Sequence, residues 1–385
     1  MAGPARGAAP PSVWVLLGKG VGGNRQMHCL AEALGWPYEP KQLVHNRLER
    51  CPNWVLGASI SNLDRRRSAV LLPPWPDLVI AASKRSAPVA RWIKRQSGGR
   101  TRLIHLMHAQ APLAHFDLVI TMPQHRLPPR PNVFHAAGPL IRLDAERLAA
   151  ARESWAPRFR DLPRPHTALL VGGNSSSYLL DETTAARLGR EASALARAEG
   201  GSLLVSTSAR TPPDAAAALT GALDGRHWVY RFRPQDADNP YLGYLALADR
   251  FIVTVDSASL LGEACATGKP VMLFEWPRRR PTALSFKGLL ERWDRIGHDG
   301  GAGPQRALGR LYDRLIDLGV LKPPRDFQAY HRGLMARGLV TPFGEPAAPG
   351  AARPLDDVDE AVARIRALVR RGADDARLAA SAAVP

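Results

Sequence analysis

The sequence contains no apolar run of the roughly 20 residues that a membrane-spanning helix needs, and only three of its 385 residues are cysteines. Cys29, Cys51 and Cys265 show neither metal-site nor redox spacing, and an odd number of cysteines without a secretion signal is typical of reduced thiols. The first eleven residues lack the apolar core of a signal peptide. We therefore interpret residues 1–11 as a disordered lead-in and expect a cytoplasmic protein.

Acidic residues are scarce relative to basic ones, with 35 Asp and Glu against 52 Lys and Arg and a net charge of +17. This excess predicts a phosphorylated or otherwise anionic partner, although a GC-rich genome also explains an Arg-rich chain. The sequence shows no helix-turn-helix, zinc-finger or RNA-binding signature, so we expect no specific nucleic acid partner. The arginine runs at residues 65–67 and 278–280 are candidates for contact with an anionic inner-membrane surface, with ordinary solvated charge as the alternative.

The order of the predicted elements indicates two α/β domains. Short, continuously apolar strands alternate with helices rich in Ala, Leu and Arg, which is typical of parallel sheets that are covered on both faces. The prolines near residues 155–165 mark the predicted boundary. The strands are expected at residues 13–17, 78–82, 103–107, 116–121 and 132–136, and then at 167–171, 202–207, 228–232, 251–255 and 271–274.

We therefore predict two Rossmann-like parallel-sheet domains that face a cleft, with the first at residues 12–160 and the second at residues 161–345. Residues 346–385 are expected to form a proline-rich linker and a C-terminal helix at about residues 356–371. That helix can pack back on the first domain. A length of 385 residues fits two domains of ordinary size.

A glycine-rich turn follows the first predicted strand, at residues 18–26. Its glycines let the backbone approach a ligand closely, and the following helix offers N–H groups at its positive end. Gly18, Gly20 and Gly23 fit the spacing of a dinucleotide-binding loop, but neither the acidic residue expected after that loop nor a Gly-Lys-Ser/Thr motif is present. A tight turn without a ligand is the alternative. The residues assigned to ligand contact here are Gly20, Gly22, Gly23, Asn24, Arg25 and Gln26.

Three further polar turns follow strands of the second predicted domain. Residues 172–177 combine two glycines, an asparagine and three serines, which suit phosphate oxygens or cap a helix. Residues 206–210 end in Arg210, which can hold a phosphate through two N–H groups or remain solvated. After the strand at 251–255, residues 256–259 open a helix. Glu263 on that helix can accept hydrogen bonds from both hydroxyls of a ribose, or it can simply complement the helix dipole.

Residues 256–263, followed by Thr267 to Val271, resemble the nucleotide-sugar site of GT-B glycosyltransferases. Residues 22–35, 116–125 and 171–175 resemble more closely the ELM1-like family, which includes bacterial proteins and a plant protein of mitochondrial fission. The resemblance covers about residues 13–340. The chain departs from the family pattern at Ala111, where members carry Asp or Asn between Gln and Pro, and at Arg126, where an acidic residue is usual.

The resemblance implies a donor site on the second domain, in which Glu263 holds the ribose and the serine and glycine turns hold the diphosphate. It also implies that the N-terminal glycine loop faces the donor phosphates or the acceptor. The nucleotide-sugar-binding residues are then Gly172, Gly173, Asn174, Ser175, Ser176, Ser206, Thr207, Arg210, Asp256, Ser257, Ala258, Ser259 and Glu263.

The expected reaction moves a sugar from a nucleoside diphosphate to a hydroxyl acceptor in cell-envelope or lipid-linked glycan synthesis. Loop N–H groups, Arg25 and Arg210 can stabilise the leaving diphosphate. We identify no Asp-x-Asp metal motif, so we expect a metal-independent transferase that needs no cofactor. Deprotonating the acceptor requires a base, for which His108 and His125 are candidates if they are not structural. The alternative is a non-catalytic GT-B scaffold that recruits a protein partner.

Overall fold

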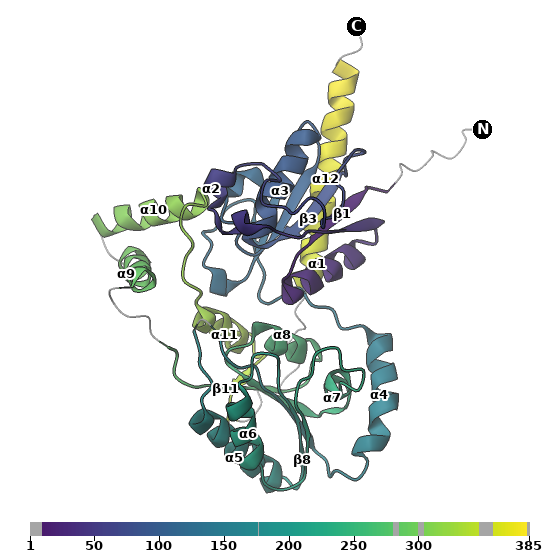
Figure 1. Ribbon diagram of the computed structural model, residues 1–385, viewed down its shortest axis with the longest axis vertical. Helices are drawn as coiled ribbons and strands as arrows, with labels where there is room; N and C mark the ends of the chain where they lie inside the picture. Colours follow the sequence, from purple (N-terminus) through teal and green to yellow (C-terminus); the bar gives the residue numbers. More distant parts are fainter. Residues whose placement is uncertain (1–9, 176, 280–284, 299–303, 346–356, 383–385) are drawn as a thin grey trace, which may run out of the picture. The chain divides into compact units, whose positions relative to one another are not determined.

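The computed structural model describes residues 10–175, 177–279, 285–298, 304–345 and 357–382. They fall into two compact units, one built from Met1–Ala136, Phe286–Pro324 and Asp357–Pro385 and the other from Ala137–Ser285 and Arg325–Asp356 (Figure 1). Each unit contains a six-stranded sheet, and neighbouring strands in both sheets run parallel. The prediction of two Rossmann-like parallel-sheet domains is confirmed.

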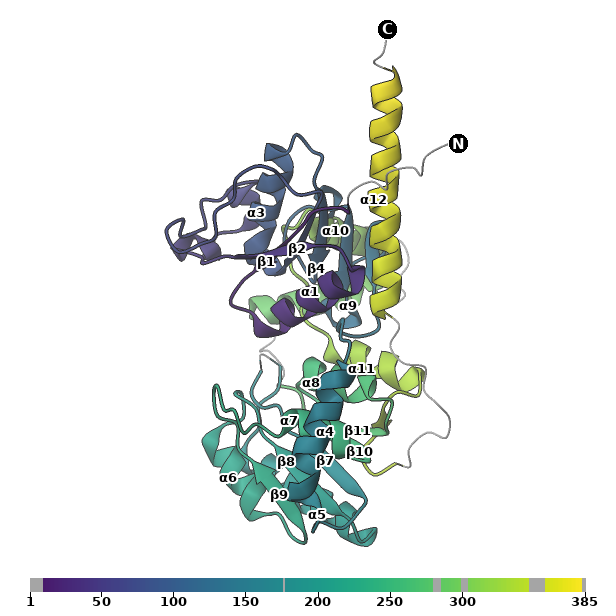
Figure 2. The same ribbon diagram turned by 90° about the vertical axis from the view of Figure 1, so that its right-hand side faces the viewer.

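The first sheet has the strand order β2-β1-β3-β4-β5-β6. Its chain direction reverses between β1 and β3, because β1 leads outward to β2 whereas β3 leads the other way to β4. Right-handed crossovers then place α1 and α3 on opposite faces of the sheet (Figure 2). The bounds are β1 Val13–Leu17, α1 Val21–Leu34, β2 Tyr38–Gln42, β3 Leu78–Ala82, α3 Ser83–Gln96, β4 Arg102–Leu106, β5 Leu118–Thr121 and β6 Val133–His135.

The C-terminal helix α12 (Asp357–Ala382) belongs to the first unit, where it lies beside α1 (Figure 1, Figure 2). Ala361 and Ile365 are fully buried, and the guanidinium of Arg366 donates to the carbonyl of Leu34 at 3.0 Å. The helix runs well past residue 371, where the sequence pattern predicted its end. Helices α9 (Phe286–His298) and α10 (Pro304–Asp317) also join the first unit, although the predicted boundaries placed them in the second.

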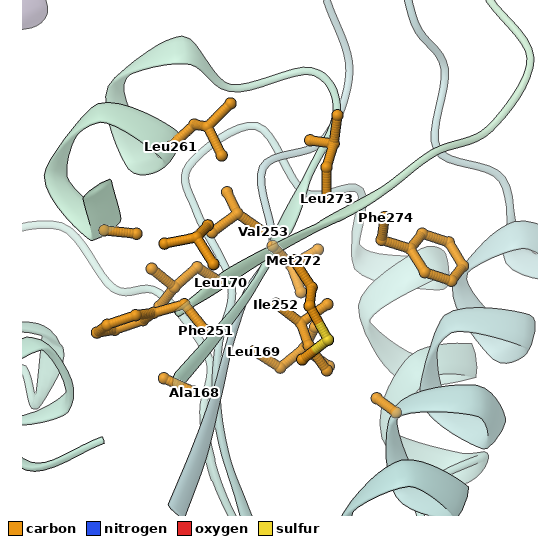
Figure 3. Close-up of a cluster of buried hydrophobic side chains, with 14 of the residues drawn as sticks. Ala168, Leu169, Leu170, Phe251, Ile252, Val253, Leu261, Met272, Leu273 and Phe274 are labelled. Carbon is orange, nitrogen blue, oxygen red and sulfur yellow. The ribbon is translucent and has the colours of Figure 1, made fainter. Parts of the chain in front are cut away.

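The second sheet has the strand order β12-β11-β10-β7-β8-β9, and its chain direction reverses between β7 and β10. The interior of this sheet is apolar on both faces, as Figure 3 shows for the cluster around Leu169, Ile252 and Leu273. The bounds are α4 Ala145–Phe159, β7 His166–Leu170, α5 Glu182–Ala198, β8 Ser202–Ser206, α6 Pro213–Gly221, β9 His227–Tyr230, α7 Tyr241–Leu247, β10 Arg250–Thr254, α8 Ala258–Ala266, β11 Val271–Phe274, α11 Phe327–Ala336 and β12 Thr341–Pro342.

The second unit begins at Ala137 rather than at residues 155–165. The reason is the packing of α4, which lies against α7. Trp155 of α4 sits so close to Gly243 that a Cβ added there would be 2.5 Å from the Trp155 Cγ. The prolines after α4 therefore end a helix of the second unit and do not mark the boundary. No helix among the described residues is long and apolar enough to cross a membrane.

Candidate functional site

The loops after β7 and β10 are joined by a buried hydrogen-bond network. The Gly172 N–H donates to the Thr254 hydroxyl at 2.8 Å, and the Gly173 N–H donates to Oδ2 of Asp256 at 2.8 Å. The Thr254 hydroxyl in turn donates to Oδ1 of Asp256 at 2.8 Å. The sheet reverses its chain direction between these two strands, so the network lies at the topological switch point of the sheet. Open parallel sheets bind ligands at this point, beyond the carboxyl ends of the strands.

The two glycines after β7 are required by close packing. A Cβ on Gly172 would lie 2.3 Å from Oδ2 of Asp256. Gly173 has a φ of +146°, which other residues rarely adopt, and a Cβ there would lie 2.1 Å from the Arg210 carbonyl oxygen. The loop after β7 therefore packs against the backbone of the loop after β8 and against the Asp256 side chain of the loop after β10, and only glycine fits at these two positions.

The carboxylate of Asp256 is fully buried and forms an ion pair with Arg210, with 2.7 Å between Nη2 and Oδ2. Burial raises the pKa of Asp256, whereas Arg210, the Thr254 hydroxyl and the Gly173 N–H act in the opposite direction. The Arg210 side chain, 41% exposed, also donates to the Asn174 carbonyl at 3.1 Å. Arg210 thus already neutralises a protein carboxylate at the position where we predicted contact with a phosphate.

The N–H groups of the loop after β7 donate within the protein. Asn174 N–H donates to the Arg210 carbonyl at 2.9 Å, and Ser175 N–H donates to the Tyr178 carbonyl at 2.9 Å. The Ser175 hydroxyl accepts from the N–H of Tyr178 at 3.1 Å. Ser176 lies outside the described residues. The loop does not cap a helix either, because α5 begins at Glu182 with Asp181 as its N-cap.

The loop after β8 is joined to this network by hydrogen bonds of its hydroxyl groups. The Ser206 hydroxyl donates to the Thr207 carbonyl at 3.3 Å, and the Thr207 hydroxyl accepts from the Phe232 N–H at 2.9 Å. The hydroxyls of Ser208 and Thr211 both donate to the Gly172 carbonyl. The hydroxyls of this turn therefore have a structural role, because they hold the loop after β8 against the loop after β7.

Helix α8 presents its N-terminus after β10. Ser257 is the N-cap and accepts from the Leu260 N–H at 3.4 Å, while Ala258 and Ser259 form the first turn and Ser259 is exposed. Glu263 follows on the same helix and is buried, with 8% of its surface exposed. The hydroxyl of Tyr241, at the start of α7, donates to Oε2 of Glu263. Tyr241 could not be predicted as a partner of Glu263, because no spacing in the sequence indicates that the two side chains meet.

Lys269, in the Thr-Gly-Lys run that resembles the GT-B pattern, binds the protein itself. Its ammonium donates to the carbonyls of Leu245, Ala246 and Ala248 at 3.0, 3.0 and 2.6 Å. These carbonyls lie at the C-terminal end of α7, where the helix dipole favours a cation. Lys269 therefore caps α7.

In the first unit, α1 begins at Val21 with Gly20 as its N-cap. The residues from Gly22 to Gln26 thus lie in the helix and not in a loop before it. The side-chain amide of Asn24 donates to the Gly18 carbonyl at 2.8 Å and accepts from the Gly18 N–H at 3.1 Å. Asn24 therefore fixes the turn from β1 into α1, and Gly23 lets the helix approach Met107, whose Cε would lie 3.2 Å from an added Cβ.

The two candidate bases are both buried, each with 6% of its surface exposed. Nδ1 of His108 accepts from the Gln110 N–H at 2.8 Å. Burial, assisted by Lys322 and His105, lowers the pKa of His108 to about 3. Nδ1 of His125 lies 3.3 Å from the Thr121 hydroxyl. The catalytic assignment of both residues stays a prediction, and a pKa this low makes His108 a weak base at neutral pH.

One pattern was missed in the sequence: Asp236 and Asp238 form an Asp-x-Asp motif, which in some transferases holds a metal. Asp236 accepts from the Tyr230 hydroxyl at 3.1 Å and pairs with Arg233 at 3.0 Å. Asp238 pairs with Arg158 at 2.6 Å. Both carboxylates are thus engaged by cations of the protein. Within the described residues, no cluster of three or more His, Cys, Asp or Glu side chains has the arrangement of a metal site.

Two Rossmann-like domains, each with a parallel six-stranded sheet, define a protein of the GT-B type. The chain belongs to the Mitochondrial fission ELM1 family, whose model matches residues 21–297. The family expected from the sequence is therefore confirmed.

The curated relatives are a plant and a bacterial protein. The chain is 30% identical over 257 residues to the Mitochondrial fission protein ELM1 of Arabidopsis thaliana, a match that covers 57% of this chain and 60% of the plant protein. The chain thus spans less than two thirds of that relative. It is 23% identical over 316 residues to an uncharacterized protein of Rickettsia prowazekii (strain Madrid E), covering 73% of this chain and 87% of that protein.

Solved structures with a similar fold include bacterial enzymes. Acinetobacter baumannii MurG is 14% identical, with a TM-score of 0.39, and the match covers 92% of this chain and 99% of MurG. UDP-GlcNAc 2-epimerase from Neisseria meningitidis, solved with UDP-GlcNAc bound, is 12% identical, with a TM-score of 0.41 and coverage of 84% and 99%.

Proposed function

We propose that the chain is a glycosyltransferase that moves a sugar from a nucleoside diphosphate to a hydroxyl acceptor, for which a lipid-linked molecule of envelope glycan synthesis is a candidate. The donor binds at the switch point of the second sheet. The observation that carries this proposal is the convergence of three strand-end loops at that edge, where α8 begins. Helix α8 also carries the buried carboxylate of Glu263.

The ribose and the diphosphate of the donor have separate ligands in this proposal. Glu263, oriented by the hydroxyl of Tyr241, accepts hydrogen bonds from the ribose. The diphosphate lies at the N-terminus of α8, where the N–H groups of the first turn and a partial positive charge of about half a unit favour an anion. Ser259 and the exposed part of Arg210 complete this end. These groups can stabilise the leaving diphosphate without a metal.

Thermal shift against UDP, GDP, CDP and CMP tests the proposal. We expect one base to stabilise the protein, and we expect Glu263→Gln to weaken that nucleotide about tenfold or more, because the amide cannot accept both ribose hydrogen bonds. Glu153→Gln changes an exposed carboxylate of the same unit and serves as the matched control. An undiminished shift in the presence of EDTA supports metal independence. Equal shifts in the wild type and Glu263→Gln would exclude Glu263 as the ribose ligand.

A non-catalytic scaffold that recruits a protein partner is the second candidate. It is favoured by one specific observation, namely that the N–H groups of Gly172, Gly173, Asn174 and Ser175 already donate within the protein. The family name, taken from a mitochondrial fission protein, is compatible with it. A protein that no nucleotide of the panel stabilises would favour the scaffold.

Peripheral association with an anionic membrane is a further part of the proposal. The side chains of Arg65, Arg66 and Arg67 are exposed, and so is that of Arg279, whereas Arg280 lies outside the described residues. Flotation with vesicles that contain anionic lipid tests this. We expect binding at low salt that Arg65→Ala, Arg66→Ala and Arg67→Ala together reduce, and a protein that stays unbound at low salt would contradict it.

A further inference from the structure

A pocket of about 90 Å³ lies in the first unit, where β1 and β3 end. These are the strands between which the first sheet reverses direction, so the pocket occupies the switch point of that sheet. Pockets that hold drug-sized ligands and nucleotides measure roughly 300–1,000 Å³. This one is far smaller, and its size fits a single compact group such as a phosphate, a sulfate or a carboxylate.

Two helices direct their N-termini at this pocket. Gly20, the N-cap of α1, and Ser83, the first residue of α3, both line it. Neither helix has a side-chain cap on its first N–H groups, and neither has an acidic residue in its first turn. Both are long enough, at 14 residues each, for a full end charge. The pocket thus faces two sets of N–H donors and two positive dipole ends.

A buried histidine faces the same space without a partner. His45 lines the pocket with 8% of its surface exposed, and neither ring nitrogen makes a hydrogen bond of normal geometry among the described residues. A buried imidazole left in this state costs free energy, unless something that enters the pocket accepts or donates a hydrogen bond. Burial lowers the pKa of His45, and the charges of Arg85 and Lys19 lower it further, whereas Glu49 and the backbone of Arg85 raise it.

The two cations at the pocket differ in their availability. The Nε of Arg85 pairs with Glu49 at 2.8 Å, so this charge is compensated. Lys19 is exposed at the rim and forms no ion pair with any residue that the structure describes. The surroundings therefore have a net positive charge with no carboxylate to balance Lys19. Such an arrangement favours an anion.

The backbone of the pocket wall is held in an unusual conformation. Ser83 and Met107 have φ angles of 70° and 66°, which residues other than glycine rarely adopt, and both line the pocket. One buried side chain contacts both of them: Nε2 of His105 lies 3.0 Å from the Ser83 carbonyl, and Nδ1 lies 3.3 Å from the Met107 carbonyl. Because a neutral imidazole carries one N–H, His105 donates to one of these carbonyls and packs against the other. His105 is thus a positioning residue that fixes the shape of the wall.

We propose that this pocket binds one oxyanion, a phosphate-type or carboxylate group, through the N-termini of α1 and α3 with His45 and Lys19 as side-chain ligands. All of these residues belong to the first unit. The proposal therefore stands independently of the donor site assigned to the second unit.

Calorimetric titration of the full chain with sulfate at low ionic strength tests the proposal. We expect saturable binding that Lys19→Ala weakens about fivefold, since it removes the uncompensated charge from the rim. Arg310→Ala removes one exposed cation of the same unit that does not line the pocket, and we expect a change of less than about twofold. Equal effects of the two variants, or an absence of saturable binding, would contradict the proposal that this pocket binds an oxyanion.

Three further measurements test the ligand, the role of His45 and the location of the bound anion. Comparing acetate with inorganic phosphate distinguishes a carboxylate from a phosphate-type ligand. Nuclear magnetic resonance of the His45 ring is expected to show its pKa rising in saturating sulfate, because an anion stabilises the imidazolium; a pKa that sulfate leaves unmoved would contradict the role of His45. Ser259→Asp adds a carboxylate to the exposed first turn of α8, the end assigned to the donor diphosphate, and must leave sulfate affinity unchanged; loss of sulfate binding in that variant would place the anion in the second unit.

Discussion

Replacing Asp256 by alanine tests the network that joins the strand ends of the second sheet. The change leaves the Gly173 N–H and the Thr254 hydroxyl without their acceptor. An unsatisfied buried polar group costs about 1–3 kcal/mol. Arg210 is 41% exposed and can turn to water, so its loss adds no more than ~1 kcal/mol. We therefore expect Asp256→Ala to lower the free energy of unfolding by about 3–5 kcal/mol.

The matched variant Asp256→Asn keeps the shape and one acceptor oxygen, so we expect a loss of only about 1–2 kcal/mol. Urea unfolding followed by tryptophan fluorescence, to which Trp155, Trp228 and Trp276 of the second unit contribute, measures the two losses. Two variants that each stay within about 0.5 kcal/mol of the wild type would refute the argument that this carboxylate holds the loops together.

The same pair of proteins gives a pH dependence of defined sign. Because burial raises the pKa of Asp256, the native state binds its proton more tightly than the unfolded state does. The free energy of unfolding of the wild type relative to Asp256→Asn is therefore highest below the ordinary pKa of an aspartate. That advantage is lost as the pH rises through the raised native pKa. A relative stability that increases with pH over this window would contradict the assignment.

Three other changes have expected outcomes. Gly173→Ala should lower the free energy of unfolding by about 2–4 kcal/mol, because the Cβ would meet the Arg210 carbonyl at 2.1 Å; a melting temperature equal to that of the wild type would exclude the observed loop geometry. Lys269→Met should cost about 2–3 kcal/mol in urea unfolding by removing three hydrogen bonds to carbonyls near the end of α7, and an unaffected variant would show that Lys269 is not a cap. Burial lowers the pKa values of His105 and His331 to about 4, so between that value and 6.5 only the unfolded state takes up their protons. Each histidine should therefore lower the free energy of unfolding by about 2 kcal/mol at pH 5 relative to pH 7. A free energy of unfolding that stays constant from pH 7 to 5 would contradict this.

Most of the fold could be predicted from continuous apolar runs. The buried strands β1, β3 and β11 match the predicted ranges, since each is covered on both faces and therefore lacks polar residues. The edge strand β2 could not be found in this way. Its sequence, Tyr38–Gln42, contains Pro40 and is polar, which only an edge position tolerates.

The assignment of segments to domains was less predictable. Helices α9, α10 and α12 join the first unit although they follow the second in the sequence. Their amphipathic patterns indicate that each covers a core, but no local pattern indicates which core. The same applies to Trp155, because its contact with Gly243, which places α4 in the second unit, joins residues that are distant in the sequence.

For the candidate site, the sequence located the strand-end loops but not the partners within them. Gly172, Gly173 and Asp256 were assigned to a ligand, and the structure shows that Gly173 donates to Asp256 while Gly172 packs against the same carboxylate. Ligand-binding turns and tightly packed turns select the same small and polar residues, so composition alone does not separate them. His45 was not identified, because a single histidine carries no signal until its burial in a pocket is known.

Titration calorimetry of the intact chain with UDP, GDP and CDP tests most directly whether the second sheet's switch point is a donor site. We predict heat of binding for one of these diphosphates, a clearly weaker affinity for the matching monophosphate, and a loss of about tenfold in Tyr241→Phe, which removes the hydroxyl that orients Glu263. Identical affinities in the wild type and in both Tyr241→Phe and Glu263→Gln, or no binding of any diphosphate, would contradict the account.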